Sequence, residues 1–187
     1  GIGILLVITG HNLGFITNFP VEHRLIYSFH MPLFFLLTGY TLKAGSYRDT
    51  ARRALAVAIP YLFMSLVMIP ISMSFDRAAN PIDLLLGILY GTGHTIDLTP
   101  LWFLSCTASA LLLLATIFFV LDKTKLTPPS LPSIQAFAIG ALLIIIGSFT
   151  LDSLNIHCKS AYGWGNLHTT GAFWNIDIAP TAAGFML

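Results

Sequence analysis

Long apolar stretches are the feature that most constrains the fold of this chain of 187 residues. A helix that crosses the hydrocarbon core of a bilayer needs about 20 mostly apolar residues, with a range of roughly 17–25. Six stretches reach or approach this length: residues 1–19, 25–42, 54–75, 101–121, 134–151 and 173–187. Only 9% of the residues are charged, against about 25% in an average soluble domain. We therefore predict an all-α fold, a polytopic transmembrane helix bundle with about six helices in this chain.

Residues 81–90 are also apolar but too few to span a bilayer, so we predict a re-entrant or interfacial helix there. The first stretch is longer than the apolar region of a signal peptide, roughly 7–15 residues, and no basic segment precedes it. This favours a membrane helix. Because the sequence begins and ends inside apolar runs, we expect residues 1–187 to form a single partial transmembrane domain of a longer protein.

The placement of lysine and arginine predicts how the helices are oriented, because cytoplasmic loops carry the excess of these residues. Six lie between the second and third helices or between the fourth and fifth: Lys43, Arg48, Arg52, Arg53, Lys123 and Lys125. Three lie in the other loops: Arg24, Arg77 and Lys159. We predict a multi-pass protein of the cell inner (plasma) membrane with a cytoplasmic N-terminus. Residues 20–24, 76–100 and 152–172 would then lie outside.

Two histidines lie within the first two apolar stretches, His11 in one and His30 in the other. An ionisable side chain is costly in hydrocarbon, so it usually faces the bundle interior, a partner or water. In the predicted orientation both histidines can reach a cavity that opens to the outside. Pro32 lies inside the second helix and removes a backbone donor there, which also favours a segment that lines a cavity. Each histidine could instead simply bind a neighbouring helix.

Three further residues lie at the outer side of the predicted bundle. Glu22 and Arg24, in the predicted turn between the first two helices, are candidates to bind a polar substrate, although most such residues are only solvated. Trp102 opens the fourth helix, where tryptophan also serves as an interface anchor. On the cytoplasmic side, Arg48, Arg52 and Arg53 are first a topology signal. They are also candidates to bind an anionic cytosolic ligand, because arginine pairs bidentately with phosphate.

The sequence argues against several other classes of site. The spacing of His94, Asp97, His157 and His168 matches no common ligand set, so we expect no metal. We find no glycine motif for nucleotide phosphates, and no basic cluster interleaved with aromatic residues that would indicate a nucleic acid partner. The expected partner is the lipid bilayer.

Four motifs occur in order across nearly the whole chain. They read GIGILLVITGHN at 1–12, IYSFHMPLFFLLTGY at 26–40, PLWFL at 100–104 and FWNIDI at 173–178. These stretches resemble the membrane-bound acyltransferase 3 family, in particular its branch of fucose 4-O-acetylase-like proteins. The resemblance implies an enzyme of roughly ten helices. Such an enzyme moves an acyl group, usually acetyl from cytosolic acetyl-CoA, to a hydroxyl of an exported or cell-surface carbohydrate acceptor.

The resemblance implies a role for His11, and the chemistry of acyl transfer suggests roles for residues near it. The family's helix-one histidine corresponds to His11, which would act as the general base on the sugar hydroxyl. Asn12 would orient His11 or the hydroxyl, and His30 would bind substrate or stabilise charge on the carbonyl oxygen. Trp102 would stack on a sugar ring. The family's basic residue upstream of the histidine falls just before Gly1, and an acyl-histidine intermediate and direct transfer both stay open.

Two alternatives to an acyltransferase stay open. One is a membrane transporter or flippase in which the histidines form a proton relay, although no inverted repeat is evident. The other is a non-catalytic membrane partner. Labelling of membranes that depends on acetyl-CoA would favour the enzyme.

Overall fold

The computed structural model describes residues 2–10, 12–42, 46–75, 80–91, 101–124, 133–161, 163–164, 167–168 and 173–187. The helices are α1 (Ile2–Gly10), α2 (Leu13–Asn18), α3 (Pro20–Tyr40), α4 (Tyr47–Phe75), α5 (Pro81–Tyr90), α6 (Trp102–Thr124), α7 (Ser133–Ala161) and α8 (Ala179–Met186). A 3-10 helix, η3 (Phe173–Asn175), precedes α8, and two short strands, β1 (Gly163–Trp164) and β2 (Leu167–His168), pair antiparallel. The prediction of an all-α fold is confirmed for the described part of the chain.

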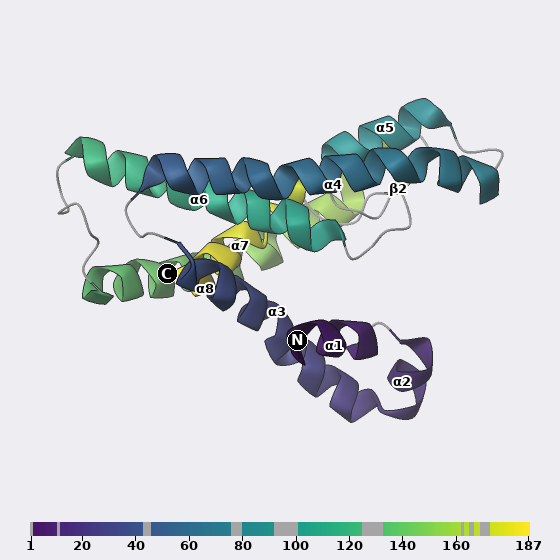
Figure 1. The fold of residues 1–187 in the computed structure, drawn as a ribbon, viewed down its shortest axis with the longest axis horizontal. Helices are drawn as coiled ribbons and strands as arrows, with labels where there is room; N and C mark the ends of the chain where they lie inside the picture. Colours follow the sequence, from purple (N-terminus) through teal and green to yellow (C-terminus); the bar gives the residue numbers. More distant parts are fainter. Residues whose placement is uncertain are drawn as a thin grey trace.

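Helices α4 and α6 lie side by side along the longest direction of the molecule (Figure 1). Helix α5 packs on α4, while α8 packs on α6, α7 and α3. From α8, α3 leads away to a lobe that it forms with α1 and α2 (Figure 1). The main core lies where α6, α7 and α8 meet, with Leu114 and Phe118 of α6, Leu143 of α7 and Ala183 of α8 all buried.

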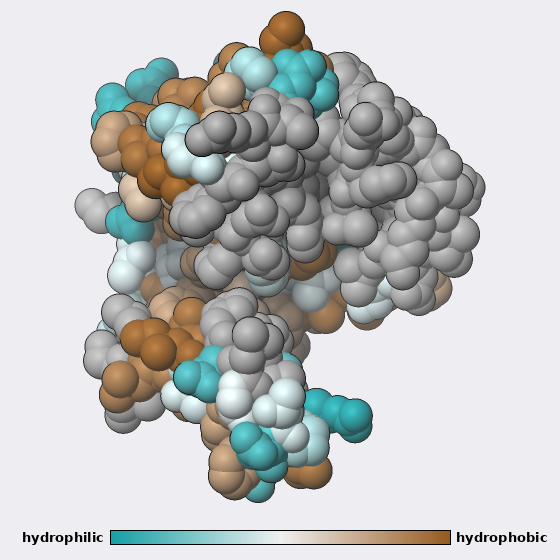
Figure 2. Space-filling model, turned by 90° about the vertical axis from the view of Figure 1, so that its right-hand side faces the viewer, coloured by the Kyte–Doolittle hydropathy of each residue, from teal (hydrophilic) through white to brown (hydrophobic). Residues whose placement is uncertain are grey.

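By length and composition, α4 over Tyr47–Ser74 and α6 are suited to cross a membrane. On α4, the side chains of Leu55, Ile59 and Phe63 follow one another at helical spacing and are each more than 60% exposed, while Tyr61 is buried. A helix with one buried face and one exposed apolar face suits contact with lipid. Figure 2 likewise shows apolar side chains at the surface, beside smaller hydrophilic patches.

Several predicted boundaries are wrong. The stretch 173–187 is not one helix, because α8 begins only at Ala179, and the helix predicted from residue 54 begins earlier, at Tyr47. The stretch 1–19 is not one helix, because α1 ends at Gly10 and α2 begins after Asn12, whose backbone is extended (φ −79°, ψ 116°). The predicted turn at 20–24 is the start of α3, and Pro20 suits a first helical position because it has no N–H to satisfy. The predicted outer loop 152–172 begins too early, since α7 continues to Ala161. The short helix predicted at 81–90 is confirmed as α5.

The close approach of α7 to α8 depends on Gly140 and Gly184. A Cβ atom on Gly140 would lie 2.9 Å from the Gly184 carbonyl oxygen, and one on Gly184 would lie 2.6 Å from the Gly140 carbonyl oxygen. We expect Gly140→Val to force the helices apart and to lower the free energy of unfolding by about 1–3 kcal/mol. Thermal unfolding of the detergent-solubilised protein measures this. Ala138→Val is the matched control, because Ala138 is exposed on the same helix; equal melting temperatures for the two variants would contradict the packing argument.

Candidate active site

The break between α1 and α2 lies at the first histidine motif. His11, the predicted base, lies outside the described residues. Its neighbour Asn12 is exposed, and its side-chain Oδ1 accepts a hydrogen bond from the Phe15 backbone N–H at 3.0 Å. Asparagine is a preferred residue at a helix N-cap because this contact satisfies an otherwise unpaired N–H. The side-chain oxygen of Asn12 is therefore already bound at the start of α2.

His30 is buried in α3, with only 1% of its surface exposed. Its Nδ1 lies 2.8 Å from the Ile26 carbonyl oxygen, one helical turn earlier. Because a carbonyl oxygen can only accept, this contact assigns a proton to Nδ1. Pro32 lies within α3, as predicted, and the helix continues past it to Tyr40. His30 is therefore oriented by its own helix.

The other predicted substrate-binding residues lie on α3, with His30, and on α6. Glu22 and Arg24 lie in the first turns of α3, and both are exposed. Trp102 is half-buried as the first residue of α6. Its neighbour Phe103 packs against two rings of α3, with ring centroids 5.7 Å from Phe34 and 5.1 Å from Phe35.

These aromatic contacts place the start of α6 beside α3, about one turn after His30. The structure thus brings the helix that carries Trp102 to the helix that carries His30. Glu22 and Arg24 lie at the far end of α3 from its junction with α4.

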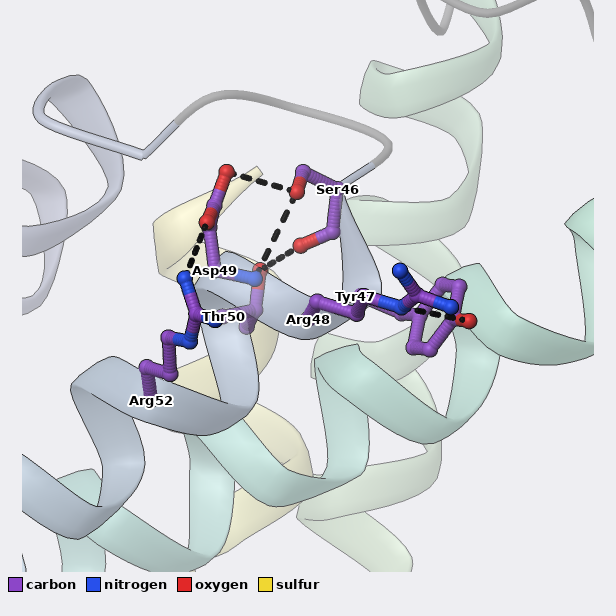
Figure 3. A network of polar contacts seen from close by, with 6 residues as sticks. All are labelled: Ser46, Tyr47, Arg48, Asp49, Thr50 and Arg52. Carbon is purple, nitrogen blue, oxygen red and sulfur yellow. Dashed lines mark hydrogen bonds and ion pairs between the residues drawn. The ribbon is translucent and has the colours of Figure 1, made fainter.

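The three predicted donor-binding arginines take different directions at the start of α4. Arg48 turns to the Tyr47 side chain, with its Nε 3.1 Å from the hydroxyl, whereas Arg52 faces Asp49 at 3.9 Å (Figure 3). Arg53 reaches back to α3, and its Nη1 donates to Thr41 Oγ1 at 2.9 Å. The sequence predicts one group of three arginines, but in the structure each arginine contacts a different partner.

The start of α4 is fixed by a reciprocal pair of hydrogen bonds (Figure 3). The Asp49 backbone N–H lies 3.4 Å from Ser46 Oγ, and that hydroxyl donates to the Asp49 carboxylate at 2.8 Å. This arrangement resembles a capping box. It holds Asp49 at the helix N-terminus, where a negative charge is favourable.

Two adjacent pockets lie where the end of α3 meets the start of α4. A polar pocket of about 350 Å³ is lined by Leu42, Asp49, Thr50, Arg52 and Arg53. A mostly apolar pocket of about 390 Å³ is lined by Phe34, Leu37, Thr38, Thr41, Arg53, Ala56, Val57 and Leu111. Arg53 lines both, so it lies between a charged pocket and a mostly apolar one. Two arginines outnumber one aspartate in the polar pocket, which therefore suits an anion.

Sequence reasoning missed the role of two polar residues just before α8, one at the end of η3 and one in the turn that follows it. Asn175 and Asp177 are 6% and 3% exposed, respectively. The Asn175 side chain lies 2.8 Å from Ser105 Oγ and contacts the start of α6. The available signal was the presence of an amide and a carboxylate inside an apolar stretch, since polar groups persist there mainly when they are bonded.

The described residues contain no group of three or more His, Cys, Asp or Glu side chains arranged to hold a metal ion. His94 and Asp97 lie outside the described residues. The expectation that no metal binds stays a prediction.

These features define a helical protein with membrane-suited apolar helices, a buried histidine and a basic pocket. A family model described as an acyltransferase domain matches residues 1–187, and the chain belongs to this acyltransferase 3 family. No curated protein and no solved structure gives a match. The family and the apolar helices together indicate a membrane acyltransferase. The fucose 4-O-acetylase-like branch stays a prediction.

The cap at Asn12 generates a prediction about the adjacent catalytic candidate. Asn12→Asp keeps an oxygen acceptor for the Phe15 N–H and should preserve both α2 and acyl transfer. Asn12→Ala loses the acceptor, which costs about 1 kcal/mol of helix stability and should reduce transfer. Transfer of labelled acetyl groups in membranes that contain the full-length protein measures both variants. If Asn12→Asp is as impaired as Asn12→Ala, the amide itself has the role, and the capping interpretation is wrong.

Proposed function

We propose that the protein is a membrane-bound O-acetyltransferase, which moves an acetyl group from cytosolic acetyl-CoA to a hydroxyl of an exported or cell-surface carbohydrate. The observation that carries this proposal is the match of the acyltransferase family to residues 1–187. The geometry of α3 supports it. This helix contains the buried His30. The residue that caps its C-terminus, Thr41, accepts a hydrogen bond from Arg53, which lines both pockets.

The gathering of positive charge at one end of the bundle supports the orientation. The rings of Tyr47 at the start of α4 and Phe119 near the end of α6 lie 5.4 Å apart. Lys123 lies over the Phe119 ring at 5.6 Å and therefore joins the three arginines of α4 at this end. Cytoplasmic ends of membrane helices carry such charge. We therefore assign this end to the cytoplasm of a cell inner (plasma) membrane, with the N-terminus also cytoplasmic.

The two pockets suit the two chemical parts of the donor. The phosphates of acetyl-CoA would bind Arg52 and Arg53 in the polar pocket, because guanidinium groups form charge-assisted, bidentate bonds with phosphate. The arm that carries the thioester would enter the apolar pocket beyond Arg53. His30 precedes Thr41 along α3 by about 16 Å at 1.5 Å rise per residue. A donor with a long arm between its phosphates and its thioester suits that separation.

The reaction itself needs a base and a stabilised oxyanion. His11 would remove the proton as the sugar oxygen attacks the thioester carbonyl, which forms the new C–O bond and breaks the C–S bond. The proton then passes from His11 to the departing thiolate. His30, whose ring is oriented by the contact of Nδ1 with the Ile26 carbonyl, would bind the carbohydrate or stabilise charge on the carbonyl oxygen. Glu22, Arg24 and Trp102 would bind the remainder of the carbohydrate.

The transporter alternative has less support. A proton relay uses the same histidines, but the family assigns an acyltransferase domain to the whole of residues 1–187. An arginine-lined opening at the predicted cytoplasmic end also serves an anionic donor directly.

The first test of this proposal is His11→Ala in the full-length protein. We expect loss of O-acetyl esters from the envelope polysaccharide, because removal of a general base typically costs about 10²–10⁴-fold in rate. Ester content per gram of polysaccharide measures the effect, and immunoblotting of membranes controls for protein abundance. Unchanged ester content at normal abundance would remove His11 from the catalytic role.

A second test addresses donor binding. Arg53→Gln should raise the KM for acetyl-CoA about 10-fold or more, because a hydrogen bond to a charged group contributes about 1.5–3 kcal/mol. The rate at saturating donor should change less. Lys123→Gln is the matched control, since it removes one positive charge from the same end of the bundle and lies outside both pockets. Equal increases in both variants would indicate a general effect of charge and contradict a phosphate site at Arg53.

A further inference from the structure

The segment that precedes α8, residues 173–178, consists of η3 and the turn after it and has an unusual backbone. Trp174 (φ 50°, ψ 27°) and Asn175 (φ 53°) are consecutive residues in the left-handed region. This conformation is unfavourable for residues with a Cβ atom, and it persists when surrounding contacts determine it. We call residues 173–178 the α8 corner. Its contacts with the rest of the molecule explain what holds it.

Trp174 attaches the α8 corner to three other helices. Its indole Nε1 donates to the Leu89 carbonyl at 2.8 Å, and its own carbonyl accepts from Ser109 Oγ at 2.8 Å. Its ring lies 5.4 Å from the Tyr61 ring. At the end of α5, Gly91 (φ 84°) lies so close that a Cβ atom there would be 2.8 Å from the indole. The corner is therefore fixed on α4, α5 and α6.

Asn175 uses its side-chain amide as a donor. Its Nδ2 lies 2.8 Å from Ser105 Oγ, 3.2 Å from the Gly91 carbonyl and 3.3 Å from the Trp102 carbonyl. The Ser105 hydroxyl donates to the Trp102 carbonyl at 2.9 Å, so it accepts from Asn175. All three contacts thus require N–H groups on residue 175. An aspartate has none and would direct a buried negative charge at two carbonyl oxygens.

These bonds fix the first turn of α6, which reaches α3 through a second set of contacts. Trp102 begins α6, and Phe103 packs on Phe34 and Phe35, just after His30. We propose that Asn175 is a positioning residue for the acceptor. By holding the start of α6, it sets Trp102 and the adjacent part of α3 in the geometry that binds the carbohydrate near His30. This inference rests on the proposed function for its kinetic consequence, and on the hydrogen bonds for its structural one.

The test is Asn175→Asp in membranes that contain the full-length protein. The donor is acetyl-CoA, and the acceptor is envelope polysaccharide from which mild base has removed the esters. We expect the KM for this polysaccharide to rise at least 10-fold while the KM for acetyl-CoA stays unchanged. Amide hydrogen exchange over residues 102–106 should become faster. Asn175→Gly, which tolerates the left-handed backbone but lacks the amide, should show the same KM change.

Asn80→Asp is the matched control. Asn80 Oδ1 accepts from the Ile82 N–H at 3.0 Å, a role that a carboxylate fills equally well, so both KM values should stay at wild type. An unchanged acceptor KM in folded Asn175→Asp protein would overturn the inference. So would a fall in kcat alone, or equal changes in both KM values, because these indicate a role in folding only. If the wild type transfers no acetyl group, the proposed function fails; unchanged exchange at the start of α6 would then still overturn the positioning role.

Discussion

A membrane interior offers no water to a backbone N–H or C=O group, so each interruption of a helix must be satisfied from within the protein. In this structure asparagines satisfy backbone groups at three interruptions of the helices. Asn12 accepts at the start of α2, Asn80 accepts at the start of α5, and Asn175 donates at the α8 corner. An amide can act as donor or acceptor without carrying a charge, which suits it to an apolar environment. The path of the chain depends on these contacts.

Other polar side chains divide into two groups with different effects. Thr38, Thr107 and Ser148 donate to carbonyl oxygens four residues earlier in their own helices. Their hydroxyl groups are hydrogen-bonded within the same helix and therefore make no bond to a neighbouring helix. Tyr61 and Ser109 instead donate to carbonyls of other elements, at 2.9 Å and 2.8 Å. The second group fixes helices relative to one another, and both of its members act where α4, α5 and α6 surround the α8 corner.

Much of the fold could be predicted because hydropathy and length are local properties. Such patterns predict the helical class, the short α5 and the choice of His30 as a candidate site residue. The break at Asn12 was missed because hydropathy stays high through residues 1–19 and does not mark where a helix ends. Asn12 carries the capping signal, but a single cap residue is a weaker signal than 19 residues of high hydropathy. In the α8 corner, tryptophan adopts a left-handed conformation against its own preference, stabilised by residues 65 and 85 positions away in sequence. No local pattern encodes such partners.

The arginines of the candidate site likewise depend on tertiary contacts that a local pattern does not predict. Charge alone grouped Arg48 with Arg53, yet only tertiary contact with Thr41 distinguishes the arginine that joins both pockets. That contact lies at the end of α3 that is fixed to the core, where Phe35 is buried and Gly39 lies directly against the backbone of Met186. The other end of α3 packs against α1 and α2, which are both short, and Val21 and Leu25 are mostly exposed. Regions with fewer buried contacts have lower local stability. The end of α3 that carries Glu22 is therefore less constrained than the end next to Thr41, and the support that α6 provides next to His30 matters correspondingly more.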